Sequence, residues 1–284
     1  MATPNPLWLD TQYNNRARVV DAMAQLQRWS ADSALARRQA PHHADLRYGA
    51  GDAEMLDLFP TTRAKAPVLF FIHGGYWRSL DKSDVSFVVP PFTAEGALVV
   101  VPNYALCPAV TIETIALQLS QALAWTWRHA AAYGGDPSNI VVAGHSAGGH
   151  LAAMLLCCDW PQVGRDLPAT LLQRALSISG LFDLEPLRHT PFLSADLRLT
   201  AASVPRLSPA GWAAPAGRTL YACVGGDESE EFLRQNTLIR ERWGAGVVPV
   251  CEAVPQRNHF NILSEFADPS SALHVHALGL LGLR

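Results

Sequence analysis

Short, continuous apolar runs recur along the chain from residue 67 onward. Unbroken apolarity, in place of alternation, is typical of strands that are covered on both faces of a parallel sheet. Stretches with helical spacing lie between these runs, so we predict a mostly parallel sheet flanked by helices. The predicted strands are VLFFI (68–72), ALVVV (97–101), NIVVAG (139–144), ALSIS (175–179), TLYACV (219–224) and VVPVCEAV (247–254), and the predicted helices are 111–132, 146–157, 229–243 and 271–282.

The first sixty residues have a different pattern. Apolar residues at near-helical spacing predict one amphipathic helix within residues 14–40, before Pro41. We interpret residues 1–44 as a helical appendage. Alternating apolar residues around a Gly-Ala-Gly-Asp turn predict a hairpin within residues 45–60.

Two stretches have no clean period and hold many Pro, Leu and Arg residues, namely residues 159–173 and 184–217. We expect both to be excursions from the sheet, and 184–217 to form a lid or pocket wall. The remaining pattern is continuous, without an internal repeat, so we predict one domain over residues 1–284.

Composition narrows the classes of function. Apolar residues make up 49% of the chain and charged residues 17%, which is typical of a globular enzyme. A net charge of −3 offers no basic field for nucleic acid or an anionic membrane. The start of the chain lacks signal-peptide features and no 18-residue apolar stretch occurs, so we expect a cytoplasmic protein.

The cysteines and a pair of histidines are the candidates for a metal or redox site. The five cysteines include no Cys-x-x-Cys spacing, which favours buried reduced thiols. His274 and His276 are two positions apart on a predicted helix and would face in different directions. We therefore expect no metal and no organic cofactor.

A nucleophile turn follows the strand at 139–144. Gly144-His145-Ser146-Ala147-Gly148 is a Gly-x-Ser-x-Gly pattern between a predicted strand and a predicted helix. The glycines permit a strained turn that exposes the serine hydroxyl, and the following helix directs its first N–H groups toward it. We predict Ser146 as the nucleophile and the N–H of Ala147 as one oxyanion donor.

A second glycine turn follows the strand at 68–72, in the sequence His73-Gly74-Gly75-Tyr76-Trp77. A serine hydrolase needs a second oxyanion donor from an earlier strand's loop, and glycines leave main-chain N–H groups uncovered. We predict Gly74 and Gly75 as this source. His73 is expected to brace the loop, whereas Tyr76 and Trp77 are assigned to the substrate pocket with the core as the alternative.

The base and the acid should follow Ser146 along the chain. His259 in NHFNIL lies past the last predicted strand, in a polar loop before a helix. The other later histidines fit less well, because they lie on helices or in the irregular excursion: His150, His189, His274 and His276. For the acid, a count of three places from Gly225 favours Glu228, and Asp227 remains the alternative.

With these residues placed, the chain resembles the α/β-hydrolase superfamily over roughly residues 45–284, and within it the kynurenine formamidase (arylformamidase) group. The resemblance rests on His-Gly-Gly-x-Trp at residues 73–77, GHSAGGHLAAML around Ser146, ESEEFLRQ after the acid turn and NHFNIL around His259. It implies the α/β-hydrolase fold, and Glu228 takes the position of the family's acid.

The same resemblance implies hydrolysis of N-formyl-L-kynurenine to L-kynurenine and formate. A carboxylesterase acting on short-chain aryl esters would use the same residues, and a non-catalytic ligand-binding protein on this scaffold is a remote alternative. We expect a small-molecule substrate as partner and leave a homodimer open. For Tyr13, Asn14 and Arg16, a structural role is favoured over a place in the pocket.

Overall fold

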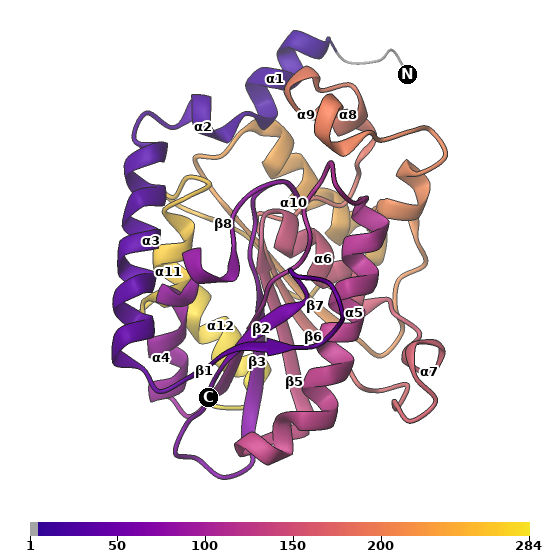
Figure 1. The fold of residues 1–284 in the computed structure, drawn as a ribbon. Helices are drawn as coiled ribbons and strands as arrows, with labels where there is room; N and C mark the ends of the chain where they lie inside the picture. Colours follow the sequence, from indigo (N-terminus) through magenta and orange to yellow (C-terminus); the bar gives the residue numbers. More distant parts are fainter. Residues whose placement is uncertain (1–4) are drawn as a thin grey trace.

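A computed structural model describes residues 5–284 of the protein (Figure 1). Its centre is an eight-stranded sheet in the order β1-β2-β4-β3-β5-β6-β7-β8. The pairs from β4 through β3 to β8 are parallel, and β1 and β2 join one edge antiparallel. The strands are β1 His43–Arg47, β2 Met55–Phe59, β3 Ala66–Ile72, β4 Leu98–Pro102, β5 Gly135–His145, β6 Arg174–Ile178, β7 Thr219–Gly225 and β8 Cys251–Val254.

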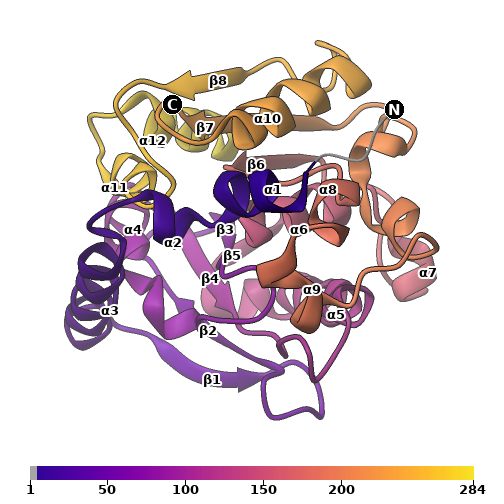
Figure 2. The same cartoon turned by 90° about the horizontal axis from the view of Figure 1, so that it is seen from above.

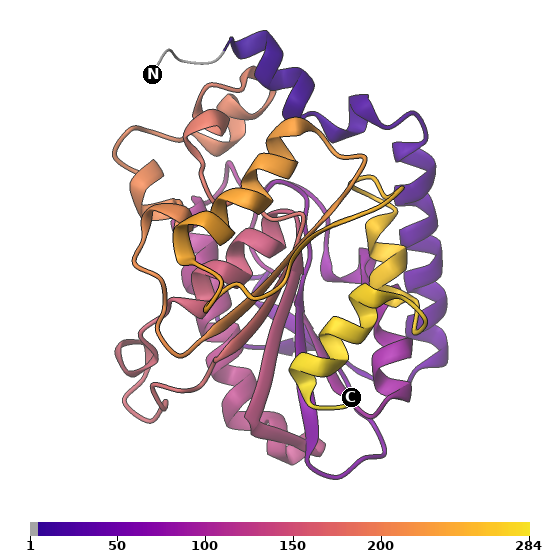
Figure 3. The same ribbon diagram turned by 180° about the vertical axis from the view of Figure 1, so that it is seen from behind.

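Helices cover both faces of this sheet, which confirms the predicted fold class. One core lies beneath α5, α6 and α10, and the other beneath α3, α4, α11 and α12. Figure 3 views the molecule from behind and shows the face of the sheet that α12 covers. The helices are α1 Pro6–Tyr13, α2 Asn15–Arg18, α3 Ala22–Gln39, α4 Val89–Ala94, α5 Ile112–His129, α6 Ala147–Leu156, α7 Trp160–Val163, α8 Glu185–Arg188, α9 Pro191–Leu197, α10 Glu230–Trp243, α11 Ile262–Ala267 and α12 Ala272–Leu281.

The two cores follow directly from the continuous apolar runs. In β3, Val68 and Phe70 enter the core under α5 and α6, whereas Leu69 and Phe71 enter the opposite core. Successive side chains of a strand alternate between faces, so a strand buried on both sides must be apolar throughout. The last run, 247–254, forms a strand only from Cys251; a proline precedes it at 249 and has no N–H for a ladder.

The N-terminal segment differs from the single helix predicted over 14–40. It forms three helices, and the chain is extended at Val19 (φ −98°, ψ 113°) between α2 and α3. Val19 and Val20 are β-branched and favour such an interruption. The view from above in Figure 2 shows α1 and α2 lying over the sheet, with α1 next to α8 and α9 and α2 leading toward α3.

The hairpin is confirmed: β1 and β2 pair antiparallel, with Leu46 opposite Leu56. The excursion at 184–217 contains α8 and α9, and the one at 159–173 contains α7. None of the helices in residues 5–284 is long and apolar enough to cross a membrane.

A buried carboxylate fastens α3 to the sheet. Asp57 on β2 is fully buried, forms an ion pair with Arg37 of α3 and lies 2.9 Å from the Lys82 ammonium through Oδ1. The N–H of Asp45 also donates to Oδ1 at 3.0 Å. Two cations and one N–H therefore compensate the desolvated charge, and they tie together three segments that are distant in sequence.

Asp57→Ala should lower the free energy of unfolding by about 3 kcal/mol or more, because Arg37 loses its carboxylate and the buried Lys82 keeps only that of the exposed Asp45. Urea unfolding measures the change. Asp166→Ala, which removes the exposed partner of Arg128, is the matched control and should have little effect. Equal losses in the two variants would contradict this account of the cluster.

Candidate active site

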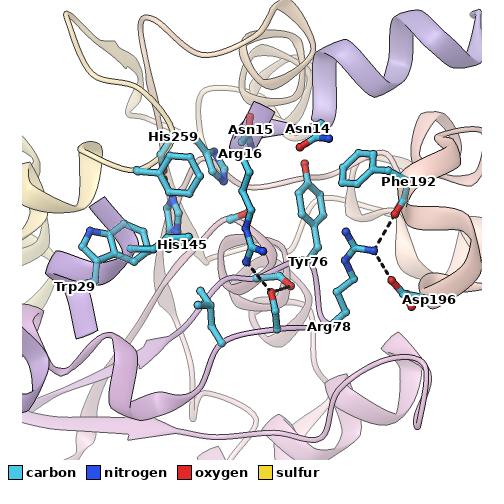
Figure 4. A pocket seen from close by; sticks show the side chains of 16 residues that line it. Asn14, Asn15, Arg16, Trp29, Tyr76, Arg78, His145, Phe192, Asp196 and His259 are labelled. Atoms are coloured by element: carbon cyan, nitrogen blue, oxygen red, sulfur yellow. Dashed lines mark hydrogen bonds and ion pairs between the residues drawn. The ribbon is translucent and has the colours of Figure 1, made fainter. Parts of the chain in front are cut away.

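A cavity of about 360 Å³ lies where the loops after the strands meet α2, α3 and α9 (Figure 4). Segments from the whole length of the chain contribute to it, and residues 159–173 contribute none of the lining found in residues 5–284. The lining residues are Asn14, Asn15, Arg16, Leu26, Trp29, Gly75, Tyr76, Arg78, Ser79, Leu80, His145, Ser146, Phe192, Asp196, His259 and Phe260.

Ser146 occupies a strained turn between β5 and α6. Its backbone has φ 56° and ψ −117°, and its N–H donates to Ile178 O on β6 at 2.8 Å. A Cβ at Gly144 would lie 2.2 Å from Gly148 O, and a Cβ at Gly148 would lie 2.1 Å from Ile72 O. Both contacts are impossible for a side chain, so the two glycines of the motif are sterically required.

The glycine loop after β3 lies against this turn. A Cβ on Gly74 would lie 3.1 Å from Ser146 Cβ, and Gly75 has φ +103° with Ser79 O in the place of a Cβ. Among the hydrogen bonds of residues 5–284, none uses the N–H of Gly74 or Gly75 as donor. Ala147 begins α6, so its N–H has no acceptor within the helix. Gly74 and Ala147 are adjacent to Ser146, and Gly75 lines the same cavity. The binding of an oxyanion by these three N–H groups stays a prediction.

His73 holds the glycine loop from behind. Its Nδ1 lies 2.9 Å from Gly74 O and its Nε2 lies 3.2 Å from Asn103 Oδ1, while its ring stacks on Tyr104. The Tyr104 hydroxyl donates to His73 O at 2.9 Å. Burial lowers the pKa of His73, so the ring is neutral near pH 7. These contacts fit the predicted bracing role.

Glu228 is the carboxylate that contacts His259. Oε2 lies 2.6 Å from His259 Nδ1, and Oε1 accepts from Gly225 N at 2.8 Å and from Ser179 Oγ at 2.5 Å. These bonds hold the carboxylate against one imidazole nitrogen, as an acid of a triad requires. Asp227 is exposed, so the geometry favours Glu228 over that alternative.

A second histidine, His145, positions His259. Nε2 of His145 lies 2.8 Å from His259 O, and burial lowers the pKa of His145 well below its usual range, so a neutral ring donates to that carbonyl. No hydrogen bond joins Ser146 Oγ to His259 anywhere in residues 5–284, although both side chains line the cavity. Such contacts often tighten only when substrate is bound.

The side chains of Tyr76 and Trp77 lie in different surroundings. Tyr76 lines the cavity, and its hydroxyl donates to Tyr13 O at 2.5 Å. Trp77 is fully buried and packs edge-on against His150, with ring centroids 5.0 Å apart. The predicted pocket position of Trp77 is therefore wrong, because the turn directs these neighbouring side chains to different sides and Trp77 enters the core.

Several residues that line the cavity do not belong to a local sequence motif, so the sequence does not predict them. Aromatic walls come from Trp29 on α3, Phe192 on α9 and Phe260 beside the histidine. Asn14 and Arg16 also line the cavity, so the preference for a purely structural role is wrong for them. Within residues 5–284, no group of three or more His, Cys, Asp or Glu residues could hold a metal ion.

Comparison with known proteins places this chain in a family. A family model described as BD-FAE matches residues 56–160. A solved structure from Silicibacter sp. TM1040, provisionally described as a thioesterase, is 34% identical, with a TM-score of 0.82 over 94% of this chain and 97% of that chain. The chain belongs to the α/β-hydrolase superfamily. Its relatives show it to be a hydrolase, which is evidence against the non-catalytic alternative.

The resemblance to the kynurenine formamidase group is also confirmed. Curated kynurenine formamidases from Danio rerio and Salmo salar are 27% and 28% identical to this α/β-hydrolase. The matches cover 84% and 87% of this chain, and 81% and 84% of those proteins.

Replacing each candidate acid by its amide tests the assignment. Glu228→Gln should lower kcat by about 10⁴-fold, as loss of the triad carboxylate does in a comparable enzyme, because His259 loses the partner that orients it. Asp227→Asn should leave kcat near wild type. Steady-state hydrolysis of p-nitrophenyl acetate measures both, and a larger loss in Asp227→Asn would reverse the assignment.

Proposed function

We propose that this α/β-hydrolase cleaves aryl formamides, with N-formyl-L-kynurenine as substrate and L-kynurenine and formate as products. The observation that carries the proposal is one cavity that holds Ser146, the glycine loop and His259 paired with Glu228. The similarity to curated kynurenine formamidases supports the choice of substrate.

In the first half of the reaction, Ser146 Oγ attacks the formyl carbon and His259 Nε2 accepts the hydroxyl proton. Glu228 stabilises the resulting imidazolium through the bond to Nδ1. The N–H groups of Gly74, Gly75 and Ala147 donate to the oxyanion. His259 then protonates the aniline nitrogen, which leaves as the amine and gives a formyl ester of Ser146.

In the second half, water replaces the amine. His259 takes a proton from this water as it attacks the formyl ester, and the same N–H groups stabilise the second oxyanion. His259 returns the proton to Ser146 Oγ as the ester bond breaks. Formate is released, and every proton transfer uses one imidazole nitrogen.

The cavity suits a small acyl group joined to an aromatic leaving group. Gly74 brings bare backbone close to the β-carbon of Ser146, so a formyl group on the serine would lie against an uncovered main chain. Aromatic rings of Trp29, Tyr76 and Phe192 form part of the lining and can contact an aryl ring edge-on or stacked.

Ester hydrolysis is the second candidate. The Silicibacter relative is provisionally described as a thioesterase, and acyl transfer from an ester would use the same serine, histidine and oxyanion donors. An activated ester also has a better leaving group than an anilide. Activity on aryl esters is therefore expected alongside formamide hydrolysis.

The ratio of kcat/KM for N-formyl-L-kynurenine to that for p-nitrophenyl acetate separates the two candidates. We expect a ratio well above one, because contacts between the cavity and the kynurenine part of the substrate would stabilise its transition state, and p-nitrophenyl acetate lacks that part. Ser146→Ala is the blank and should lose about a millionfold in kcat. A ratio far below one would make this protein a small-ester hydrolase with the same mechanism.

A further inference from the structure

The short helix α2 is held over the cavity by contacts at its start. The side chain of Asn14 accepts from Ala17 N at 3.2 Å and caps the helix. Just before it, Tyr13 O accepts from the Tyr76 hydroxyl, and the Tyr13 hydroxyl donates to Glu231 at 2.6 Å. These bonds position the residues that follow Tyr13 above the glycine loop.

Among residues 5–284, the cavity carries one arginine that no carboxylate neutralises. Arg78 forms an ion pair with Asp196 and donates to Phe192 O at 2.8 Å. Arg16, the other lining arginine, makes no ion pair within the part of the chain that the structure describes. Its Nη2 reaches only Ser79 Oγ, at 3.5 Å, so most of its donors remain available (Figure 4).

The neighbouring Asn15 supplies a second, independent sign of a ligand. It is 5% exposed and lines the same cavity. Its Nδ2 is a buried donor without a hydrogen-bond partner among residues 5–284. Buried donors are normally satisfied, so an unpaired one beside a free guanidinium points to an acceptor that arrives with the substrate.

We infer that Arg16 and Asn15 form a carboxylate-binding subsite, and that the preferred substrates carry a carboxylate on the leaving group. This inference rests on the proposed function. A formyl group cannot carry a carboxylate, so in a formamide substrate the carboxylate must be on the leaving group. The carboxylate accepts from the Arg16 guanidinium and from Asn15 Nδ2. A planar fork of N–H donors matches the two carboxylate oxygens and would also fix the orientation of the aryl ring.

A matched pair of substrates tests the subsite: N-formyl-L-kynurenine and its carboxamide, which share the scissile bond. Wild type should prefer the acid, and Arg16→Gln should lower the acid-over-amide ratio of kcat/KM by about 10- to 100-fold, mainly through KM. Asn15→Ala should lower it by about tenfold or less. Arg16→Lys keeps the charge without the fork and should restore part of the preference.

Arg18→Gln is the matched control, because Arg18 is on the same helix, donates to Thr11 O at 3.2 Å and does not line the cavity. Its acid-over-amide ratio should equal that of wild type. An unchanged ratio in Arg16→Gln, in a protein that cleaves N-formyl-L-kynurenine, would overturn the subsite and leave the proposed function intact.

The converse failure is also distinguishable. If wild type cleaves neither kynurenine compound, the same variants are compared on 3-(4-acetoxyphenyl)propanoate and its amide, which are aryl esters with and without a carboxylate. A preference for the acid that depends on Arg16 would support the subsite while the formamidase proposal fails. No such preference on either pair would overturn the subsite.

Discussion

The close approach of two backbone turns is the constraint on which the site depends. The turn after β5 and the loop after β3 touch through glycines, since a Cβ on Gly148 would overlap Ile72 O and one on Gly74 would press against Ser146 Cβ. Parallel pairing of β3 with β5 ends both strands at the same edge. Because no side chain fits between them, bare N–H groups and the serine hydroxyl share one small volume.

The order of the strands in the sheet brings the other parts of the site to the same edge. β6 accepts the Ser146 N–H through Ile178 O, and the turn after β7 carries Glu228. The loop after β8 carries His259, which the carboxylate and His145 hold from two sides. The proposed catalytic groups therefore lie at the carboxyl ends of neighbouring parallel strands, where ligands of open α/β sheets bind.

The walls of the substrate cavity come from other elements of the fold than the catalytic groups do. Its walls come from α2, α3 and α9, which are helices outside the parallel sheet. They are held by long-range polar contacts, such as Arg37 of α3 with Asp57 and Tyr13 with Glu231. Changes in these segments could alter specificity without disturbing the turns that perform the reaction.

This difference explains how much the sequence could predict. Ser146, Gly74 and His259 lie in turns or loops that follow apolar strands, so short local patterns identify them. The buried contact with His259 distinguishes Glu228 from Asp227, and sequence alone only favours it.

Other features depend on tertiary contacts that leave no periodic signal. Trp29 and Asn15 reach the cavity only because distant segments pack together. Trp77 shares a motif with Tyr76, but the direction of its side chain is decided by the core it enters. The break at Val19 needs only two or three residues, fewer than a helical pattern can resolve.

The central claim is that Ser146 is the nucleophile and that His259 activates it. The most direct test is to react the protein with a fluorophosphonate and locate the adduct by peptide mass spectrometry, in wild type and in His259→Ala. We expect one adduct, on Ser146, in wild type, and a severe loss of labelling rate in His259→Ala. An adduct on another cavity serine such as Ser79, or equal labelling of the two proteins, would contradict the account.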